Sequence, residues 1–157
     1  MDLKNSILGL YKGHVYTIEY QKRTLLHMHL LLFIKRELQF NTPALIDQVV
    51  YAELPNPSQD PTGKLTAVVI SQMSHSLCSA DNLIALCIVC KTPNSLLVCS
   101  KGFPKPFSAN TIVYKDGYLE YQRRDDRRTF AVPKPGFLNE QVVYDNCWIV
   151  PYNLYLL

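Results

Sequence analysis

The chain has 157 residues, of which 48% are apolar and 18% are charged, so its composition is that of one globular domain. This balance excludes a large multidomain enzyme and a disordered tail. The formal net charge of +3 permits binding to a polyanion without a strong basic excess. The longest uncharged apolar stretch before Lys35 runs from Leu30 to Ile34, far below the roughly 20 residues of a membrane helix. The first ten residues lack the apolar region and cleavage site of a secretory signal. We therefore expect neither a membrane span nor secretion.

The first predicted element is a β-hairpin. The run His14–Tyr20 is rich in β-branched and aromatic residues, Met28–Ile34 is a second apolar run, and the polar QKRT between them suits a turn. Strand alternation places every second side chain on one face, and the faces of the two strands meet if the hairpin closes. These faces carry Thr17, Glu19 and Gln21 on the outgoing strand, and His27, His29 and Leu31 on the returning strand.

The paired histidines predict a metal site on this hairpin. His27 and His29 project from one face at i and i+2 and can share a cation. Glu19 supplies a third ligand, with Gln21 as the alternative if the turn is shorter. Two imidazoles and one oxygen ligand leave open positions on Mg²⁺ or Mn²⁺, which can polarise a phosphodiester oxygen. The alternative is a structural histidine pair; the flanking leucines and the phase of Glu19 favour the metal site.

A helix and a surface loop are predicted next. Thr42 is a suitable N-cap, Pro43 suits the first helical position, and apolar residues follow at helical spacing. We therefore expect a helix over Pro43–Leu54. Prolines and a glycine then predict a surface loop over Asn56–Lys64.

The second half of the chain is less regular. Leu65–His75 suits either a strand or a helix, and Cys78–Cys99 has no clear periodicity. Thr111–Arg128 predicts two short strands around the turn at Asp116 and Gly117, because an Asp-Gly pair readily adopts positive φ.

The cysteines follow a metal-binding spacing. Five cysteines, an odd number, argue against a disulfide framework and leave metal ligation or burial. His75 and Cys78 form an H-x-x-C pair, Cys87 and Cys90 form a C-x-x-C pair, and Cys99 follows. Such thiolates and imidazoles can hold tetrahedral Zn²⁺. The alternative is a set of buried free cysteines, since the intervening residues are unusually apolar.

A basic segment with neighbouring aromatic residues suggests single-stranded DNA as a partner. Cationic groups bind phosphates, while aromatic faces such as Tyr118 and Tyr121 stack on bases. The alternative is a solvated hairpin whose charge Asp125 and Asp126 partly neutralise. The candidate DNA-binding residues are Lys101, Lys105, Arg123, Arg124, Arg127 and Arg128.

Four segments together resemble one family. VYTIEYQKRTLLHMHLLLF resembles the hairpin VIEFQKRGLPHxH of the replication-initiator domain of Helitron rolling-circle transposases, an HUH motif. CSKGFPKPF from Cys99, GYLEYQRRDDRRT from Gly117 and NCWIVPYNLYLL from Asn146 are similar to that family's CSKxFPKPF, GYPxYRRR and NRWVVPYNPYLL. The four segments stand in the family's order and span nearly the whole chain.

The resemblance implies metal-dependent nicking and rejoining of single-stranded DNA, in which a tyrosine attacks a phosphodiester. His27 and His29 then correspond to the HUH metal ligands, and Glu19 or Gln21 to the third. The resemblance also implies a nuclear location. The positions that it carries over as a candidate structural zinc site are His75, Cys78, Cys87 and Cys99.

Several departures from the family affect the expected activity. The family's nucleophilic tyrosines lie in a motif like YxxKYxxKG beyond the VPYNPYLL segment, where this sequence stops, so we expect the nucleophile to be missing. Tyr152 and Tyr155 match noncatalytic positions and are interpreted as structural. No GxxxxGK[ST] motif supports ATP hydrolysis. Thr24 and Leu26 replace the glycine and proline that shape the family's turn before the first histidine.

Together these observations predict an α+β fold: an incomplete antiparallel sheet of HUH-endonuclease type, a packed helix, and an irregular cysteine-containing C-terminal half. One partial domain spans 1–157, with the hairpin and helix in 1–54, a loop in 55–64 and the basic region in 65–157. The predicted function is that of a Helitron-like initiator fragment acting on single-stranded DNA. The alternative is a noncatalytic DNA-binding remnant or domesticated module, stabilised by zinc.

Overall fold

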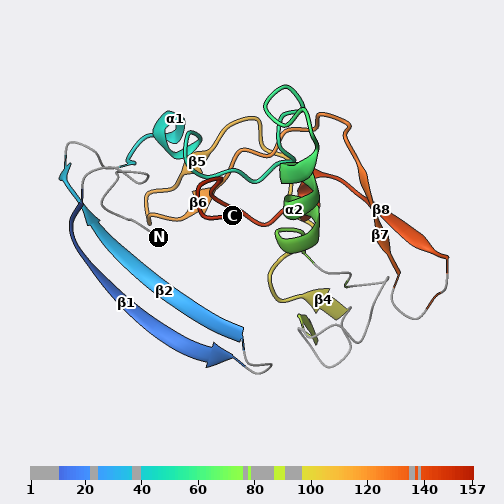
Figure 1. The fold of residues 1–157 in the computed structure, drawn as a ribbon, viewed down its shortest axis with the longest axis horizontal. Coiled ribbons are helices and arrows are strands. Elements are labelled where there is room, and N and C mark those ends of the chain that lie inside the picture. Colours follow the sequence, from blue (N-terminus) through green and yellow to red (C-terminus); the bar gives the residue numbers. More distant parts are fainter. Residues whose placement is uncertain are drawn as a thin grey trace.

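The structure is a computed structural model that describes residues 11–21, 25–36, 40–75, 78, 87–90, 97–134, 137 and 139–157, without the side chains of 21, 25–27, 88–90 and 97. Within this part the chain is α+β, with small antiparallel two-stranded sheets and few helices (Figure 1). In chain order the elements are β1 (Tyr11–Gln21), β2 (Leu25–Ile34), α1 (Pro43–Ile46), α2 (Lys64–Gln72), β3 (Ile88–Cys90), β4 (Leu97–Cys99), β5 (Ile112–Val113), β6 (Leu119–Glu120), β7 (Phe130–Pro133), β8 (Gln141–Tyr144) and the 3-10 turn η4 (Asn146–Trp148).

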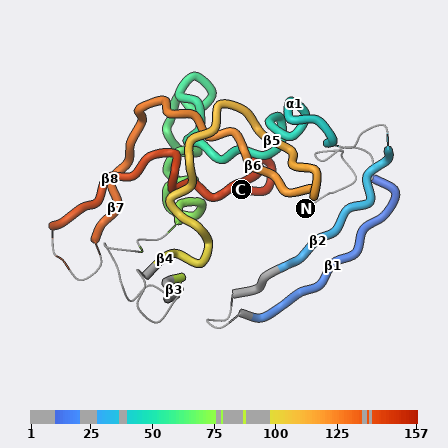
Figure 2. Tube along the Cα trace, turned by 180° about the vertical axis from the view of Figure 1, so that it is seen from behind, coloured from blue at the N-terminus to red at the C-terminus, as the bar shows by residue number. Residues whose placement is uncertain are grey.

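The predicted hairpin is confirmed as β1 and β2, which pair antiparallel along their length. It forms a long curved ribbon at one side of the molecule, clearly seen in both views (Figures 1 and 2). Large apolar side chains are exposed on both faces, for example Val15 and Leu31 on one face and Ile18 and Met28 on the other. An isolated two-stranded ribbon is marginally stable in water, so this element needs further cover. The turn residue Thr24 and the side chain of Leu26 lie outside the described part of the structure.

The predicted helix over Pro43–Leu54 is wrong in its extent. Only Pro43–Ile46 is helical, and Thr42 makes no side-chain cap bond. The chain is extended at Tyr51, which exchanges two backbone hydrogen bonds of 2.8 Å with Tyr152. This long-range pairing, after two β-branched valines, outweighs the local helical pattern.

Several predictions further along the chain are resolved. The segment Leu65–His75, for which the sequence suited either a strand or a helix, forms α2 over most of its length. The predicted Asn56–Lys64 loop ends where α2 begins. The predicted strand pair around the Asp-Gly turn is confirmed as β5 and β6, with Gly117 at φ 82°. Sequence patterns did not predict the β7–β8 hairpin.

The core lies between α2, the extended segment at residues 51–54, the β7–β8 hairpin and the C-terminal segment. Its buried members are Leu54, Val69, Phe130, Tyr144, Ile149 and Tyr152. The C-terminal segment also bonds to the end of α2, where the amide of His75 donates to the carbonyl of Trp148 at 2.8 Å. The C-terminal segment therefore lies in the core and connects the end of α2 to the extended segment at residues 51–54.

Asn146, in the C-terminal segment, is buried, and its side chain hydrogen-bonds to two other segments of the chain. Its side-chain oxygen accepts from the amide of Leu54 at 2.8 Å, and its side-chain nitrogen donates to the carbonyl of Arg124 at 2.9 Å. Both ends of the amide are therefore satisfied, which offsets the cost of burying it.

Candidate metal centre

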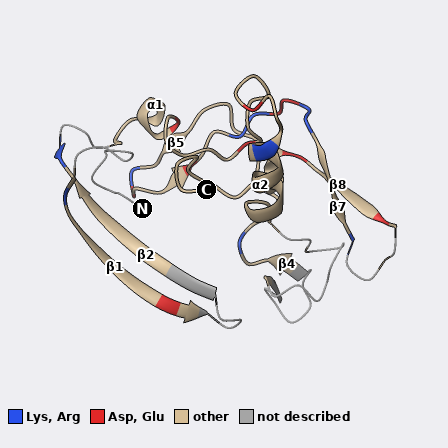
Figure 3. Ribbon diagram, viewed as in Figure 1, with Lys and Arg blue, Asp and Glu red and all other residues tan. Residues whose placement is uncertain are grey.

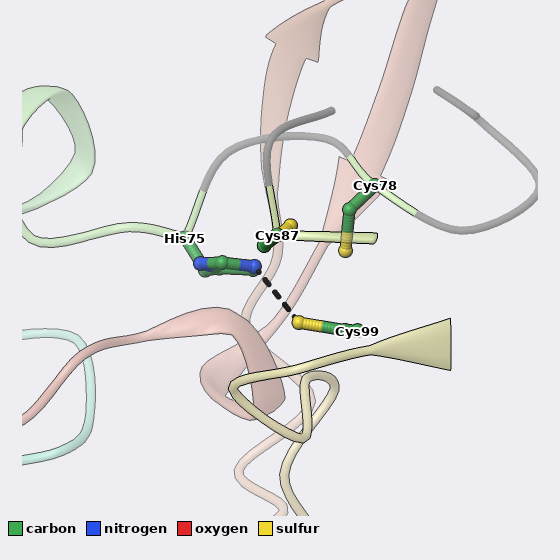
Figure 4. A group of neighbouring side chains, drawn as sticks. All are labelled: His75, Cys78, Cys87 and Cys99. Carbon is green, nitrogen blue, oxygen red and sulfur yellow. Dashed lines mark hydrogen bonds between the residues drawn. The ribbon is translucent and has the colours of Figure 1, made fainter. Parts of the chain in front are cut away.

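The four residues carried over as a zinc site converge in space. One ligand atom from each of His75, Cys78, Cys87 and Cys99 lies within 4.8 Å of the others, and Figure 4 shows the four side chains directed toward one another. Cys78 and Cys99 are buried, while His75 and Cys87 are half-buried. The candidate zinc site defined by sequence is therefore a real cluster in the fold. The side chain of Cys90 lies outside the described part.

Local structure explains how distant residues meet. His75 follows α2, and its backbone is fixed by Trp148. Cys87 precedes β3 and Cys99 ends β4, and the amide of Ser100 donates to the carbonyl of Cys87 at 2.6 Å. The small β3–β4 sheet thus holds two of the thiols side by side.

The environment of Cys99 favours a thiolate. Burial opposes the charge, but the backbone amides of Phe103 and Lys101 and the thiols of Cys87 and Cys78 donate toward the sulfur and together lower the pKa of Cys99. The turn that delivers these amides is closed by the Gly102 amide, which donates to the Cys99 carbonyl at 3.0 Å with Gly102 at φ 66°. Amide donors around a ligating sulfur are the usual outer shell of a metal thiolate.

The position of His75 suits a metal ligand that binds through Nε2. Its Nε2 lies 3.3 Å from the sulfur of Cys99, and its ring stacks on Phe103 at 4.3 Å between centroids. Burial, with the positive charges of Lys105 and Lys101, lowers the pKa of His75 and so favours the neutral imidazole, the form that binds a metal.

These donors fit Zn²⁺. Bonds of about 2.0–2.3 Å in a tetrahedral zinc site place the ligand atoms about 3.3–3.8 Å from one another. The His75–Cys99 separation of 3.3 Å already meets this requirement, and the 4.8 Å limit on the whole group needs only a small contraction. Three thiols and one imidazole complete four-coordination, which is the pattern of a structural site rather than a catalytic one.

The HUH residues occupy one face of the β1–β2 hairpin. Glu19 lies directly opposite His27, and Thr17 lies opposite His29. The carboxylate of Glu19 reaches the Nε2 of His29 at 3.5 Å, and both side chains are 59% exposed. The side chains of His27 and Gln21 lie outside the described part, but Gln21 is opposite Leu25, two residue pairs beyond Glu19 and His27. The backbone register thus places Glu19 nearer the two histidines than Gln21.

Arg123 does not present its charge to solvent, which corrects its interpretation as a phosphate ligand. It is 4% exposed, and its Nη1 donates to the carbonyls of Ala52, Asn146 and Ile149 at 3.0, 2.5 and 2.7 Å. This arginine joins three segments of the core instead.

Two other candidate DNA-binding arginines already have protein partners. Arg124 forms a two-pronged pair with Glu53, at 3.0 and 2.7 Å, and this pair raises the pKa of Arg124. Arg128 pairs with Asp126 and also donates to two backbone carbonyls. Neither guanidinium is free to turn toward a phosphate without breaking these bonds.

The remaining three of the six candidate residues form no ion pair with another described residue. Arg127 and Lys101 are exposed, and Lys105 is half-buried beside the ring of Phe103. Figure 3 shows Lys and Arg positions spread over several loops, with Asp and Glu positions among them. The accessible charge is therefore local and modest.

The two C-terminal tyrosines differ. Tyr152 is buried, its hydroxyl donates to the carbonyl of Glu53 at 2.9 Å, and burial raises its pKa, so it cannot present an oxyanion to DNA. Tyr155 is exposed. Cys147 is half-buried, and burial raises its pKa to about 11, which agrees with simple packing.

Neither protein-family models nor curated proteins give a match to this chain. In the described part of the chain, the helices fall short of the length and apolarity required to cross a membrane.

Proposed function

We propose that this chain is part of a Helitron-like replication initiator that binds single-stranded DNA and cuts it with the help of Mg²⁺ or Mn²⁺. The observation that carries the proposal is the register of the β1–β2 hairpin, which sets Glu19 and His27 opposite each other and His29 on the same face. Two imidazoles and a carboxylate on an exposed face suit a cation that also binds substrate.

Each residue has a defined part in this proposal. Glu19 lies 3.5 Å from His29 and neutralises part of the charge of a bound cation. When bound, such a cation polarises a phosphodiester oxygen as a Lewis acid. The exposure of both side chains leaves room for a DNA strand along this face. The attacking tyrosine is not assigned, because Tyr152 is buried and hydrogen-bonded.

The cluster of His75, Cys78, Cys87 and Cys99 has a separate, structural part. We assign it Zn²⁺, which would join the end of α2 to the β3–β4 sheet. Small sheets with few apolar contacts gain much of their stability from such a link.

A strand-cleavage assay tests the proposal. Labelled single-stranded DNA is incubated with the protein and Mn²⁺ and resolved on a denaturing gel, with the double variant His27→Ala/His29→Ala and a metal-free reaction beside it. His14→Ala is the matched control, since His14 lies on the opposite face of the same hairpin and stacks near Tyr16. We expect cleavage that is lost in the double variant and without metal but kept in His14→Ala. Equal loss in His14→Ala would show that the hairpin fold, rather than a metal site, had been disturbed.

A second candidate is a noncatalytic, zinc-stabilised module that binds single-stranded DNA. The convergence of the four zinc donors, beside the burial of Tyr152, favours it. DNA binding without cleavage in the same assay, together with one bound zinc per chain by elemental analysis, would select this candidate.

A further inference from the structure

An aromatic pocket lies next to the segment that carries the zinc cluster. It has a volume of about 380 Å³ and is formed by Lys105, the β5–β6 hairpin and part of the C-terminal segment. Three tyrosines line it: Tyr114, Tyr118 and Tyr121. The volume lies at the lower end of the range for small-ligand pockets, which suits one planar ring system.

The β5–β6 turn fixes the backbone of Tyr114 and Tyr118 at the pocket. The amide of Tyr114 donates to the carbonyl of Tyr118 at 2.9 Å, and the carboxylate of Asp116 accepts from the amide of Tyr118 at 3.0 Å. Gly117 supplies the positive φ that closes this turn. Tyr118 is nevertheless 68% exposed, so a rigid turn presents a large aromatic face to solvent. An exposed aromatic face is the feature on which unpaired bases stack.

Polar groups of both signs accompany the rings. The hydroxyl of Tyr114 donates to Oε2 of Glu120 at 2.8 Å, while Oε1 of Glu120 accepts no hydrogen bond from the described residues. A carboxylate oxygen beside an aromatic surface accepts from the amino group of a base. Lys105 is one of the residues that line the pocket, and its Nζ lies 5.4 Å from the centre of the Phe103 ring beside it. The tyrosine rings can stack on a base, the Glu120 carboxylate can accept from the amino group of that base, and Lys105 can contact a phosphate.

We propose that this pocket takes one unpaired base of a single-stranded DNA, stacked on Tyr118, with its amino group at Glu120 and the neighbouring phosphate at Lys105. The inference rests on the proposed function for the choice of DNA, and it locates a base-binding site away from the histidine face. Arg123 also lines the pocket, but its Nη1 donates to three backbone carbonyls, so the phosphate is assigned to Lys105.

The test compares DNA with and without bases. Anisotropy of a labelled 15-nucleotide oligo(dC), and of an abasic backbone of the same length, gives dissociation constants for the zinc-loaded chain and for Tyr118→Ala. We expect Tyr118→Ala to weaken oligo(dC) binding by about 5- to 150-fold, the effect of losing one stacked base, and abasic binding by less than about twofold. Phe137→Ala is the matched control, since Phe137 is also exposed and lies beside a lysine outside the pocket.

A second variant tests the cation. Lys105→Ala should reduce the dependence of log affinity on log salt by about 0.7, the amount expected for one phosphate contact on a single strand. Unchanged oligo(dC) binding in Tyr118→Ala, or equal losses on the two DNAs, would overturn the base pocket and leave DNA binding itself intact. Absence of oligo(dC) binding by the unmodified chain would instead overturn both the proposed function and the pocket's occupant.

Discussion

Replacing Arg123 with methionine should destabilise the fold rather than weaken a DNA contact. Three carbonyl oxygens, from Ala52, Asn146 and Ile149, surround the single nitrogen Nη1. That nitrogen carries two hydrogens, so one hydrogen is shared between two of the oxygens. Methionine keeps most of the apolar stem and removes only the donors.

The size of the effect follows from this count. A hydrogen bond from a charged donor contributes about 1.5–3 kcal/mol, so two hydrogens give about 3–6 kcal/mol. Burial lowers the pKa of Arg123, which shows that desolvation of its charge opposes part of this gain. We therefore expect the free energy of unfolding to fall by about 3–5 kcal/mol, a large share of the about 5–15 kcal/mol typical of a domain.

Urea unfolding followed by circular dichroism measures this change. With a slope of about 2 kcal/mol per molar urea, the midpoint should fall by about 1.5–2.5 M. Arg127→Met is the matched control, because Arg127 is exposed in the same segment, and its stability should change by less than about 0.5 kcal/mol. If the Arg123→Met protein had unchanged stability and reduced affinity for single-stranded DNA, the structural role of Arg123 would be refuted. The interpretation of Arg123 as a phosphate ligand would then be correct.

Three further predictions concern the core, an ion pair and the metal centre. Tyr152→Phe should lower the free energy of unfolding in urea by about 1–3 kcal/mol, because the carbonyl of Glu53 loses its hydrogen-bond donor. Any DNA cleavage should stay unchanged in this variant, and abolished cleavage would identify Tyr152 as the nucleophile. Burial opposes the charge of Asp126, but the hydrogen bonds and the charge of Arg128 outweigh burial and lower the pKa of Asp126 below 3.8. The ionised carboxylate therefore stabilises the fold above that pH, and this stabilisation is lost as the pH falls through the folded pKa. Asp126→Asn should flatten the acid limb of the stability–pH curve measured by urea unfolding, and an unchanged limb would contradict this role. Chelation of zinc should alter the fluorescence of Trp148, which lies 6.3 Å from the ring of His75, and a spectrum insensitive to both chelator and added zinc would argue against metal in the cluster.

Local patterns predicted those parts of the fold whose partners lie nearby in sequence. The β1–β2 hairpin and the turn at Gly117 follow from alternation and from one glycine, and both are present. The helix after Thr42 was predicted too long because the pairing of Tyr51 joins a residue about a hundred positions away. Spacing alone could not foresee that contact.

The candidate sites divide in the same way. The sequence grouped His75 with Cys78, Cys87 and Cys99, and the structure brings one ligand atom of each within 4.8 Å of the others. Sequence patterns placed Arg123 among the DNA-binding charges, because the carbonyls to which it donates lie 23 to 71 positions away. No local signal distinguishes a buried arginine in a run of arginines from an exposed one. Tyr114 was overlooked because only the closed turn brings it to the pocket with Tyr118.

The candidate zinc cluster and the aromatic pocket share one stretch of chain. Cys99 ends β4, the ring of Phe103 stacks on His75, and the amide of Lys105 donates to the carbonyl of Cys147 at 2.9 Å before Lys105 enters the pocket wall. Metal binding at one end of this stretch therefore restrains the position of the wall at the other. Because a preorganised wall spares the DNA the cost of ordering it, zinc removal should weaken oligo(dC) binding through Lys105 as well as destabilise the fold.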